Sequence, residues 1–545
     1  MRSGRWLAAS AVVGLVVALV GAASITASGG STSSSGAANF PEPSSFPIVN
    51  PGVPTGAQRL HFEVGPITVT PGQNSIGLTR TIPEPSVDGW IVGMRTNLRK
   101  ADGTVPPVNV IHLHHGVWLN LGNPDATASL PERFFAAGEE KTVTALPPGY
   151  GYQYKTTDKW ILNWMLHNNT PDATPIWITY DIDLIPATSP MAQGITAAHP
   201  IWMDVQNGSG YPVFDVLNNS GSGGTYTYPS QAADPYGTGP VKNQWTVPTD
   251  GVLLGTGGHV HPGGLYDDLW LTRKGATGAK GHVKPGSPDT AHLFRSVASY
   301  WEPAGKVSWD FAATTTPFSW RPVVHKGDVL SITSTYDSKH AAWYESMGIM
   351  VVWMADTTAK GGVDPFQHPV DVSGVLTHGH LPENNQHGGK PATSAYTDLR
   401  KVKSQVVPSG TVIPIMDFSY GLGDMSGADS IPAVYAGGTL TFRNDDAAAP
   451  AGRGRGEGAN GVAAKNIYHT ITACAAPCDL SSGIAYPIAN APIQFDSGEL
   501  GRGGAPASGS LTWSVPKDLP PGTYTYFCRI HPFMRGGFRV LAPPK

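Results

Sequence analysis

The stretch Tyr524-Thr-Tyr-Phe-Cys528-Arg-Ile-His531-Pro-Phe-Met534 decides the fold of the last part of the chain. A strand-like run delivers the cysteine, and a histidine and a methionine follow at successive steps of three residues in one tight turn. A further histidine, His469, lies upstream in a strand-like segment. Two imidazoles, one thiolate and a weak axial thioether form a trigonal copper site suited to one-electron transfer. The pattern predicts a type 1 blue copper centre held by His469, Cys528, His531 and Met534.

This segment resembles the cupredoxins of the short-loop amicyanin and plastocyanin type over about residues 408–545. The resemblance implies a cupredoxin Greek-key β-barrel, which we place at residues 406–545. The neighbours of the cysteine are Phe527 and Arg529, whereas multicopper oxidases and copper nitrite reductases would have histidine there, so both classes are disfavoured. Cys474 and Cys478 form a CxxxC pair that predicts a disulfide in an exported protein, with a metal clip as the alternative.

The composition of the whole chain predicts an all-β protein. Gly 66 and Pro 49 break regular helices, and charged residues reach only 14%, so good surface-helix formers are scarce. Short strand-like runs recur between turn signals, as in β-sandwiches and barrels. The net charge of −4 lacks the basic excess of a nucleic-acid-binding protein, so no nucleic-acid partner is expected.

The ends of the predicted domains follow from composition. Two arginines and a long run of apolar and small residues in residues 1–28 predict a secretory signal, with an uncleaved membrane anchor as the alternative. We therefore expect a secreted, cell-surface or periplasmic protein, without stable membrane insertion if the signal is cleaved. The remaining predicted parts are a disordered linker at 29–45, sandwiches at 46–192 and 193–358, and a linker at 359–405.

Histidine pairs mark the two predicted sandwiches. Ile111-His-Leu-His-His115 and Gly258-His-Val-His261 each contain a His-x-His pair. In a strand, residues two apart point to the same face, about 6–7 Å from one another, which suits two ligands of one metal ion. A solvent-facing strand is the plainer interpretation of any one pair.

Residues 45–358 resemble the copper type II, ascorbate-dependent monooxygenases, which include peptidylglycine α-hydroxylating monooxygenase and dopamine β-monooxygenase. The resemblance implies two jelly-roll-like β-sandwiches, each with one mononuclear copper. The implied first site is all-histidine, and the second joins two histidines to a methionine. By position, the first set is His114, His115 and His167, and the second set, which we expect to be catalytic, is His259, His261 and Met347.

The ligand types agree with the implied chemistry. A thioether is a soft ligand that stabilises Cu(I), and an open position at such a site can react with O2. An all-histidine site can hold and release an electron. The sequence thus predicts a monooxygenase acting on a small organic molecule with O2, with the blue copper domain as electron relay. A small reductant or a redox protein would be the electron donor.

Departures from the family narrow the substrate. Gly257 and Val351 stand where the peptide-amidating members carry an arginine and a tyrosine, so a peptidylglycine substrate is disfavoured. Gly116 stands where the family usually has methionine. His112 is an additional histidine that points with His114 in a strand, and its replacing His115 as ligand stays open.

Two other functions compete with the monooxygenase. A non-enzymatic secreted copper-binding or electron-transfer protein would use the sandwiches as scaffold. A metal hydrolase ranks last, because no general-base glutamate adjoins the histidine pairs. Trp118 and Trp343 are candidates for a substrate cleft. His378, His380 and His387 are interpreted as part of a solvated, loosely metal-binding or structural linker loop, with a bridging role near a copper site as the alternative.

Overall fold

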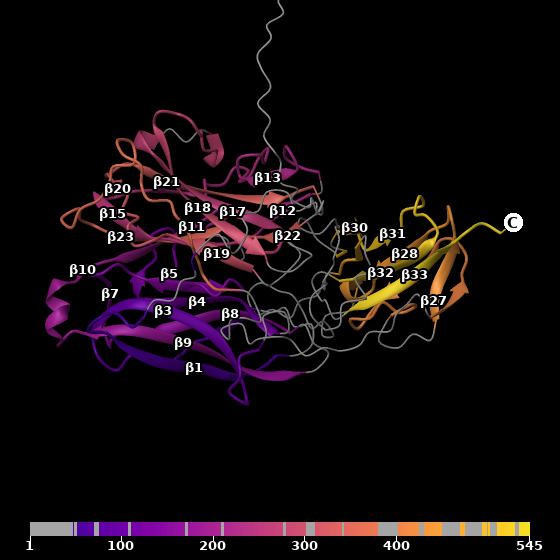
Figure 1. Cartoon of the computed structure of the whole chain (residues 1–545), viewed down its shortest axis with the longest axis horizontal. Coiled ribbons are helices and arrows are strands. Elements are labelled where there is room, and N and C mark those ends of the chain that lie inside the picture. Colours follow the sequence, from indigo (N-terminus) through magenta and orange to yellow (C-terminus); the bar gives the residue numbers. More distant parts are fainter. Residues whose placement is uncertain are drawn as a thin grey trace, which may run out of the picture. The chain divides into compact units, whose positions relative to one another are not determined.

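The protein is all-β, as the sequence predicts. The computed structural model describes residues 47, 52–69, 76–106, 111–168, 173–208, 212–217, 219–275, 279–300, 311–339, 343–379, 402–424, 430–448, 469–474, 493–498, 500–501, 510–528 and 534–544. The helical elements within these ranges are 3-10 turns, the longest being the five-residue η2 (Pro190–Gly194). Strands supply the rest of the regular structure (Figure 1).

The first sandwich shows why these residues form strands. In β9 (Thr174–Pro186) every second residue from Ile176 to Leu184 is buried, so isoleucine, tyrosine and leucine fill one face. On the other face Asp183 pairs with Arg59 of β1 (Gln58–Val69). The sheet order is β1-β9-β3-β7-β10, with β6 on β3; the other bounds are β3 (Gly89–Lys100), β6 (Val143–Ala145), β7 (Tyr150–Tyr154) and β10 (Thr196–Ala197).

A second sheet packs on this one and carries the histidines. Its order is β2 (Ile76–Thr79), β8 (Trp160–Asn168), β4 (Ile111–Pro124) and β5 (Pro131–Gly138). Trp118, Phe135 and Tyr180 meet in the core between the two sheets. Trp118 is fully buried there, so the expectation that it lines a substrate cleft is wrong.

The second sandwich has a separate hydrophobic core. One sheet has the order β11 (His199–Asp204), β23 (Ile349–Ala355), β15 (Gly251–Gly255) and β20 (Val323–Val324), with β16 (Gly258–His259) on β23. The larger sheet has the order β13 (Thr225–Tyr228), β21 (Val329–Asp337), β17 (Gly264–Thr272), β18 (Thr290–Tyr300), β19 (Phe311–Thr315) and β24 (Val375–Leu376), with β14 (Gln244–Thr246) on β21. β12 (Phe214–Val216) pairs with β22 (Trp343–Ser346). Trp343 is buried in this core and does not line a cleft.

The two sandwiches are in direct contact. Val252, Leu254 and Trp353 of the second sandwich belong to the core of the first. The ring of Trp353 lies 5.9 Å from that of Tyr152. Such continuous apolar packing fixes the position of one sandwich against the other, and side chains from both can therefore build one site.

The C-terminal strands form two sheets. The first has the order β25 (Lys403–Val406), β27 (Ser430–Tyr435), β33 (Arg535–Leu541), β32 (Gly522–Phe527), β29 (Thr472–Cys474) and β30 (Ile493–Asp496). The second has the order β26 (Thr411–Ile415), β28 (Leu440–Asn444) and β31 (Thr512–Ser514). In the described residues these sheets face a shared core and do not close into the expected barrel.

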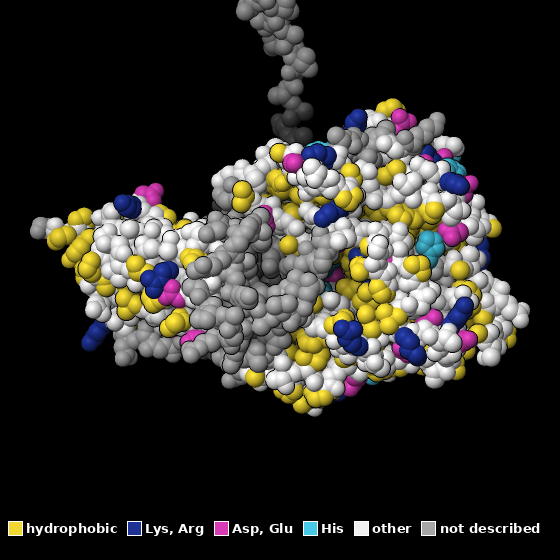
Figure 2. All heavy atoms as spheres, turned by 180° about the vertical axis from the view of Figure 1, so that it is seen from behind, with side chains coloured by type: hydrophobic (Ala, Val, Ile, Leu, Met, Phe, Trp, Pro, Cys, Tyr) yellow, Lys and Arg dark blue, Asp and Glu magenta, His cyan; other side chains and the backbone are white. Residues whose placement is uncertain are grey.

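The predicted signal, the linker at 29–45 and residues 380–401 of the linker at 359–405 lie outside the described residues. Within the described ranges, no helix has the length and apolar character needed to span a membrane. On the face drawn in Figure 2, basic and acidic side chains are scattered among neutral and apolar ones, in keeping with the small net charge.

Candidate metal centres

A buried thiol and a buried imidazole face each other in the C-terminal domain. Cys528 follows β32, and its Sγ lies 3.9 Å from Nδ1 of His469. The backbone N–H of Thr470 donates to this sulfur at 3.4 Å. The backbone N–H of Cys528 donates to the carbonyl of Met534, whose side chain is also buried. Three of the four predicted ligands therefore lie together, and His531 falls outside the described residues.

An aspartate that was not among the predicted site residues is hydrogen-bonded to the other edge of this imidazole. Oδ2 of Asp446 lies 2.8 Å from Nε2 of His469. The same carboxylate accepts the backbone N–H groups of Asp417 and Phe418, which are consecutive non-glycine residues with φ of 52° and 58°. Burial opposes charge on His469, but the hydrogen bonds to Asp446 and Cys528 outweigh it and raise the pKa of His469 to about 9.

With Nε2 bonded to Asp446, His469 keeps Nδ1 toward the sulfur, which is the orientation a metal ligand needs.

The structure does not test the predicted disulfide between Cys474 and Cys478. Cys478 and the side chain of Cys474 lie outside the described residues, so the pairing stays a prediction.

The first-sandwich histidines converge because their two strands pair. β4 and β8 are antiparallel with His112 opposite His167, and Nε2 of His112 lies 3.1 Å from Nδ1 of His167. The ring of His114 lies 4.5 Å from that of His167. A β-bulge between Leu113 and His115 places one extra residue of β4 against β8.

Because of this bulge, His112, His114 and His115 can all contribute side chains to one cluster. Nδ1 of His115 lies 3.4 Å from Nδ1 of His114, while its Nε2 bonds Oδ1 of Asn163 at 2.9 Å. The predicted set His114, His115 and His167 is thus brought together. His112 lies in contact with His167 of this set, and its replacing His115 as ligand stays an open alternative.

The second sandwich adds its own histidines to the same cluster. The ring of His261 lies 4.3 Å from that of His114 and 5.2 Å from that of His259. The two predicted histidine sets are therefore in contact, not separate as expected. β16 pairs with β23 so that His259 stands opposite Ile349, two residues after Met347, and Met347 and His259 line one cavity.

One buried hydroxyl links the second set. Oη of Tyr336 accepts the backbone N–H of His261 at 2.9 Å and that of Met347 at 3.1 Å, and donates to the carbonyl of Met347 at 2.7 Å. This uses the full hydrogen-bonding capacity of the hydroxyl. Tyr336 is fully buried, and it fixes the histidine turn against the methionine loop.

We expect Tyr336→Phe to destabilise the protein by about 2–4 kcal/mol, because two buried N–H groups and one carbonyl lose their partner. The relative position of His261 and Met347 would loosen, so metal binding at this set should weaken. Urea unfolding and metal stoichiometry would measure both effects. Tyr236→Phe is the matched control, since its hydroxyl donates to the carbonyl of Val205 in the same sandwich, and it should leave metal stoichiometry unchanged.

Two carboxylates reach the cluster from the end of β5. Glu140 accepts Nδ1–H of His259 at 2.8 Å and the N–H of Gly138 at 2.9 Å, and Glu139 lies 3.7 Å from Nε2 of His112. Sequence reasoning missed both, because they are far from either His-x-His pair along the chain. The sequence-based argument against a hydrolase, that no glutamate adjoins the histidine pairs, is therefore wrong, because the two glutamates lie beside these histidines in the folded chain.

Gly138 permits this approach. A Cβ at position 138 would lie 2.6 Å from Cε1 of His259 and 2.7 Å from the carbonyl of His114. Both distances are shorter than real contacts, so the two sandwiches could not meet in this way with a larger residue. The glycine thus sets the distance between the histidines of the two sandwiches.

Two imidazoles of the cluster, those of His114 and His115, are held neutral. Burial, together with the surrounding histidines, lowers the pKa of His114 well below its usual value. Burial also lowers the pKa of His115 to about 4. Burial and the nearby Glu140 raise the pKa of Glu139 well above its usual value. Neutral imidazoles are the form that binds metal ions.

The donor set fits a copper ion. Nε2 of His259 is buried and has no hydrogen-bond partner among the described residues, whereas its Nδ1 is bound by Glu140. A carboxylate on one ring nitrogen and an open second nitrogen is the usual arrangement of a metal-ligating histidine. Imidazoles and a thioether are ligands that copper accepts. Glu139, Glu140 and His259 also hold ligand atoms within 4.8 Å of one another.

Other residues selected from the sequence have structural roles. Both ring nitrogens of His378 contact backbone carbonyls, those of Gly379 and Phe311, and the residue is fully buried. The structural interpretation of this histidine therefore agrees with the structure, and the solvated one is wrong. His380 and His387 lie outside the described residues.

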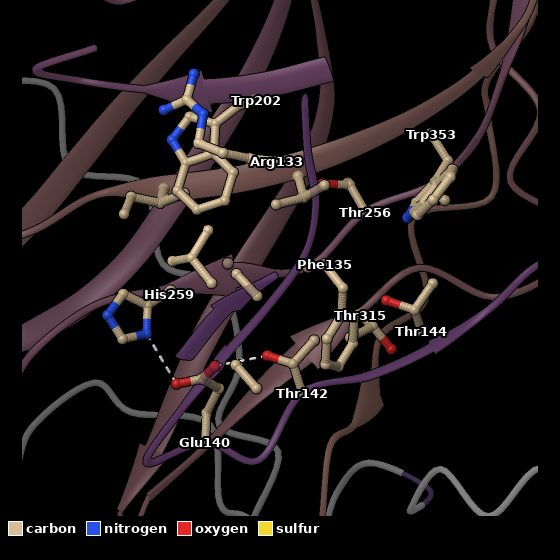
Figure 3. A pocket seen from close by; sticks show the side chains of 18 of the residues that line it. Arg133, Phe135, Glu140, Thr142, Thr144, Trp202, Thr256, His259, Thr315 and Trp353 are labelled. Atoms are coloured by element: carbon tan, nitrogen blue, oxygen red, sulfur yellow. Dashed lines mark hydrogen bonds and ion pairs between the residues drawn. The ribbon is translucent and has the colours of Figure 1, made fainter. Parts of the chain in front are cut away.

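A cavity of about 620 Å³ adjoins the cluster (Figure 3). Both sandwiches contribute to its walls, and His115, His259 and Met347 are among the lining residues. Figure 3 shows Glu140 bonded to His259 and to Thr142, with Arg133 lying against Trp202. The tryptophans that line it are Trp202 and Trp353, not the two expected from the sequence.

The chain has only weak similarity to known proteins. No protein-family model matches the chain, and no curated protein does. Among solved structures, a Cu-containing nitrite reductase (NirK) from Thermus scotoductus SA-01 is 12% identical, over 54% of this chain and 55% of its own, with a TM-score of 0.17. The infectious bursal disease virus VP2 subviral particle is 10% identical, over 61% of this chain and 82% of its own, with a TM-score of 0.17. The chain spans about half of the nitrite reductase, and neither neighbour's activity is transferred to it.

Proposed function

We propose that the chain is an exported copper-dependent monooxygenase that hydroxylates a small organic substrate with O2 and carries its own electron-transfer domain. The observation that carries the proposal is the contact of His114 with His261 beside a cavity that His259 and Met347 line. Histidines from two sandwiches meet where a substrate-sized space begins. The export signal in residues 1–28 remains part of the proposal.

Three groups of side chains would hold copper. The first is His114, His115 and His167 with His112 beside them, the second is His259, His261 and Met347, and the third is His469, Cys528, His531 and Met534. Copper bound at these groups would supply O2 activation and single-electron transfer.

The chain's own residues prepare the site for this chemistry. Glu140 orients His259 so that Nε2 faces away from the carboxylate, and Tyr336 fixes the backbone of His261 against that of Met347. The apolar cavity walls keep water from the reacting carbon. Each turnover would break one substrate C–H bond and the O–O bond, and form one C–O bond. The second oxygen would leave as water, with two protons from solvent and two electrons from an external reductant.

Metal stoichiometry and electron paramagnetic resonance of the full chain test the proposal. We expect three coppers per chain, one blue and two not blue. His167→Ala should remove one non-blue signal, because losing a ligand lowers affinity at least about 100-fold. His325→Ala is the matched control, since this half-exposed histidine pairs with Asp250 outside the cluster, and it should keep all three signals.

A single blue centre per chain, with no other copper, would contradict the monooxygenase. That result would favour the non-enzymatic electron-transfer protein. If three coppers are present, oxygen uptake coupled to hydroxylation of a neutral organic compound decides between the two functions, and uptake without product would count against the enzyme.

A further inference from the structure

We propose that the substrate is an uncharged, largely apolar organic molecule, because the cavity beside His259 and Met347 offers it no free charged group. The inference rests on the proposed function and names its substrate class. The cavity measures about 620 Å³, within the range of about 300–1,000 Å³ of sites for small ligands. A molecule with one or two rings would fit.

The walls are apolar and come from both sandwiches. The first sandwich contributes aliphatic and aromatic side chains from β4 and β5, and the second contributes them from β11, β15 and β23. Representative lining residues are Val117, Phe135, Ala136, Trp202, Leu254 and Trp353. Burying apolar surface against such walls is worth about 25 cal/mol per Å², so binding affinity would come from hydrophobic contact.

The positive charge in the lining is already neutralised. Arg133 donates to both oxygens of Asp125, at 2.7 Å and 2.9 Å, and its guanidinium lies 4.5 Å from the ring centre of Trp202. Both side chains of this pair are nearly buried, at 9% and 3% exposure. A substrate carboxylate would have to displace Asp125 before it could bind Arg133.

The negative charge in the lining is also in use. Glu140 accepts hydrogen bonds from His259, Thr142 and the N–H of Gly138. An ammonium group on the substrate would compete with all three. Since an unpaired charge in a buried site costs several kcal/mol, either sign of charge on the substrate is disfavoured.

Three threonine hydroxyls near the cavity are hydrogen-bonded within the protein, whereas that of Thr256 is buried and has no partner among the described residues. Thr142 donates to Glu140, Thr315 donates to the carbonyl of Val375, and Thr316 bonds the backbone of Thr256. The three bonded hydroxyls therefore offer few additional hydrogen bonds to a strongly polar substrate. The neutralised charges and the bonded hydroxyls of the lining therefore both favour an uncharged, largely apolar molecule.

Competition binding to the metal-free full chain tests the inference. The neutral fluorophore N-phenyl-1-naphthylamine would occupy the cavity, and butylbenzene, 4-phenylbutanol and 4-phenylbutyrate would compete for it. We expect the two neutral compounds to displace the fluorophore at concentrations about 10-fold or more below the carboxylate, equivalent to about 1.4 kcal/mol. Equal displacement by all three, or tighter binding of the carboxylate, would overturn the proposal.

Two variants locate the binding. Ala136→Trp would fill the cavity and should weaken fluorophore binding about 10-fold or more, whereas Ala101→Trp in an exposed turn is the matched control and should not. Unchanged binding by Ala136→Trp would overturn the assignment to this cavity.

Asp125→Asn gives a second measurement that does not depend on adding bulk. It keeps one oxygen for the turn hydrogen bonds but frees the charge of Arg133, so the preference for neutral compounds should shrink or reverse. A preference unaffected by Asp125→Asn would contradict the role of the ion pair. Because every arm uses the metal-free chain, these results are independent of the copper stoichiometry that tests the proposed function.

Discussion

Cys528→Ser is expected to abolish the blue colour of the copper-loaded chain and to cut turnover with a protein electron donor about 100-fold or more. The reason is that a hydroxyl cannot replace the covalent bond between thiolate and copper, and even outer-shell changes at metal sites cost about 10–100-fold. The sulfur is fully buried and faces His469, so no other thiol in the described residues can substitute for it. Visible absorption and steady-state oxygen uptake would measure the two losses.

The same variant carries its own control. With a small diffusible reductant, which can reach the upstream coppers directly, Cys528→Ser should keep a substantial part of its turnover. Its two non-blue paramagnetic signals should also remain. Equal activity of parent and variant with every donor would show that the C-terminal domain is not the electron relay.

Acidification from about pH 6.5 to pH 4 is expected to destabilise the metal-free chain strongly. Partial burial lowers the pKa of His115 to about 4, so in this range the unfolded chain binds a proton that the folded chain does not bind. Stability therefore falls as the pH falls through this window. Moving this one pKa from 6.5 to about 4 is worth about 3 kcal/mol, and the lowered pKa of His114 acts in the same direction.

Calorimetry across this pH range would measure the effect. His115→Gln keeps a polar side chain that cannot titrate, so its melting temperature should depend less on pH than that of the parent. Copper should flatten the pH dependence of the parent until protons displace it, because a ligand that binds only the folded state adds stability. Parallel pH curves for parent and His115→Gln would refute the assignment of the acid sensitivity to this residue.

Features encoded over short stretches were predictable from the sequence. The spacing from Cys528 to Met534 predicted that these residues would be neighbours, and their backbones are hydrogen-bonded. The alternation in β9 is visible as isoleucine, tyrosine and leucine at every second position, and those residues form the core. The pair His259 and His261 was also correctly predicted to be neighbours, with rings 5.2 Å apart, although His261 lies beyond the end of β16.

Features that depend on tertiary packing were not predictable. Glu140 and His259 are 119 residues apart, and Tyr336 reaches His261 across 75. Their contact follows from the packing of two sandwiches, which no local pattern records. The β-bulge beside His114 is equally hidden, because an inserted residue in a strand changes no residue type in the sequence.

The expected separation of the two upstream histidine sets was wrong for the same reason. Each set was recognised within its own domain, and the distance between sets depends on a single small residue, Gly138, at the interface. Asp446 is a second residue whose role could not be predicted from a local pattern. It lies 23 residues before His469, with a segment outside the described residues between them, and only the fold brings the two together.

The meeting of His114 and His261 also sets an order of events in the making of the protein. Neither sandwich alone presents the full group of imidazoles, so a nascent chain that has completed only the first cannot yet offer the finished cage. On the proposed function, each sandwich carries a full ligand set of its own and can bind copper before docking, whereas the short path for an electron between the two sets exists only after docking.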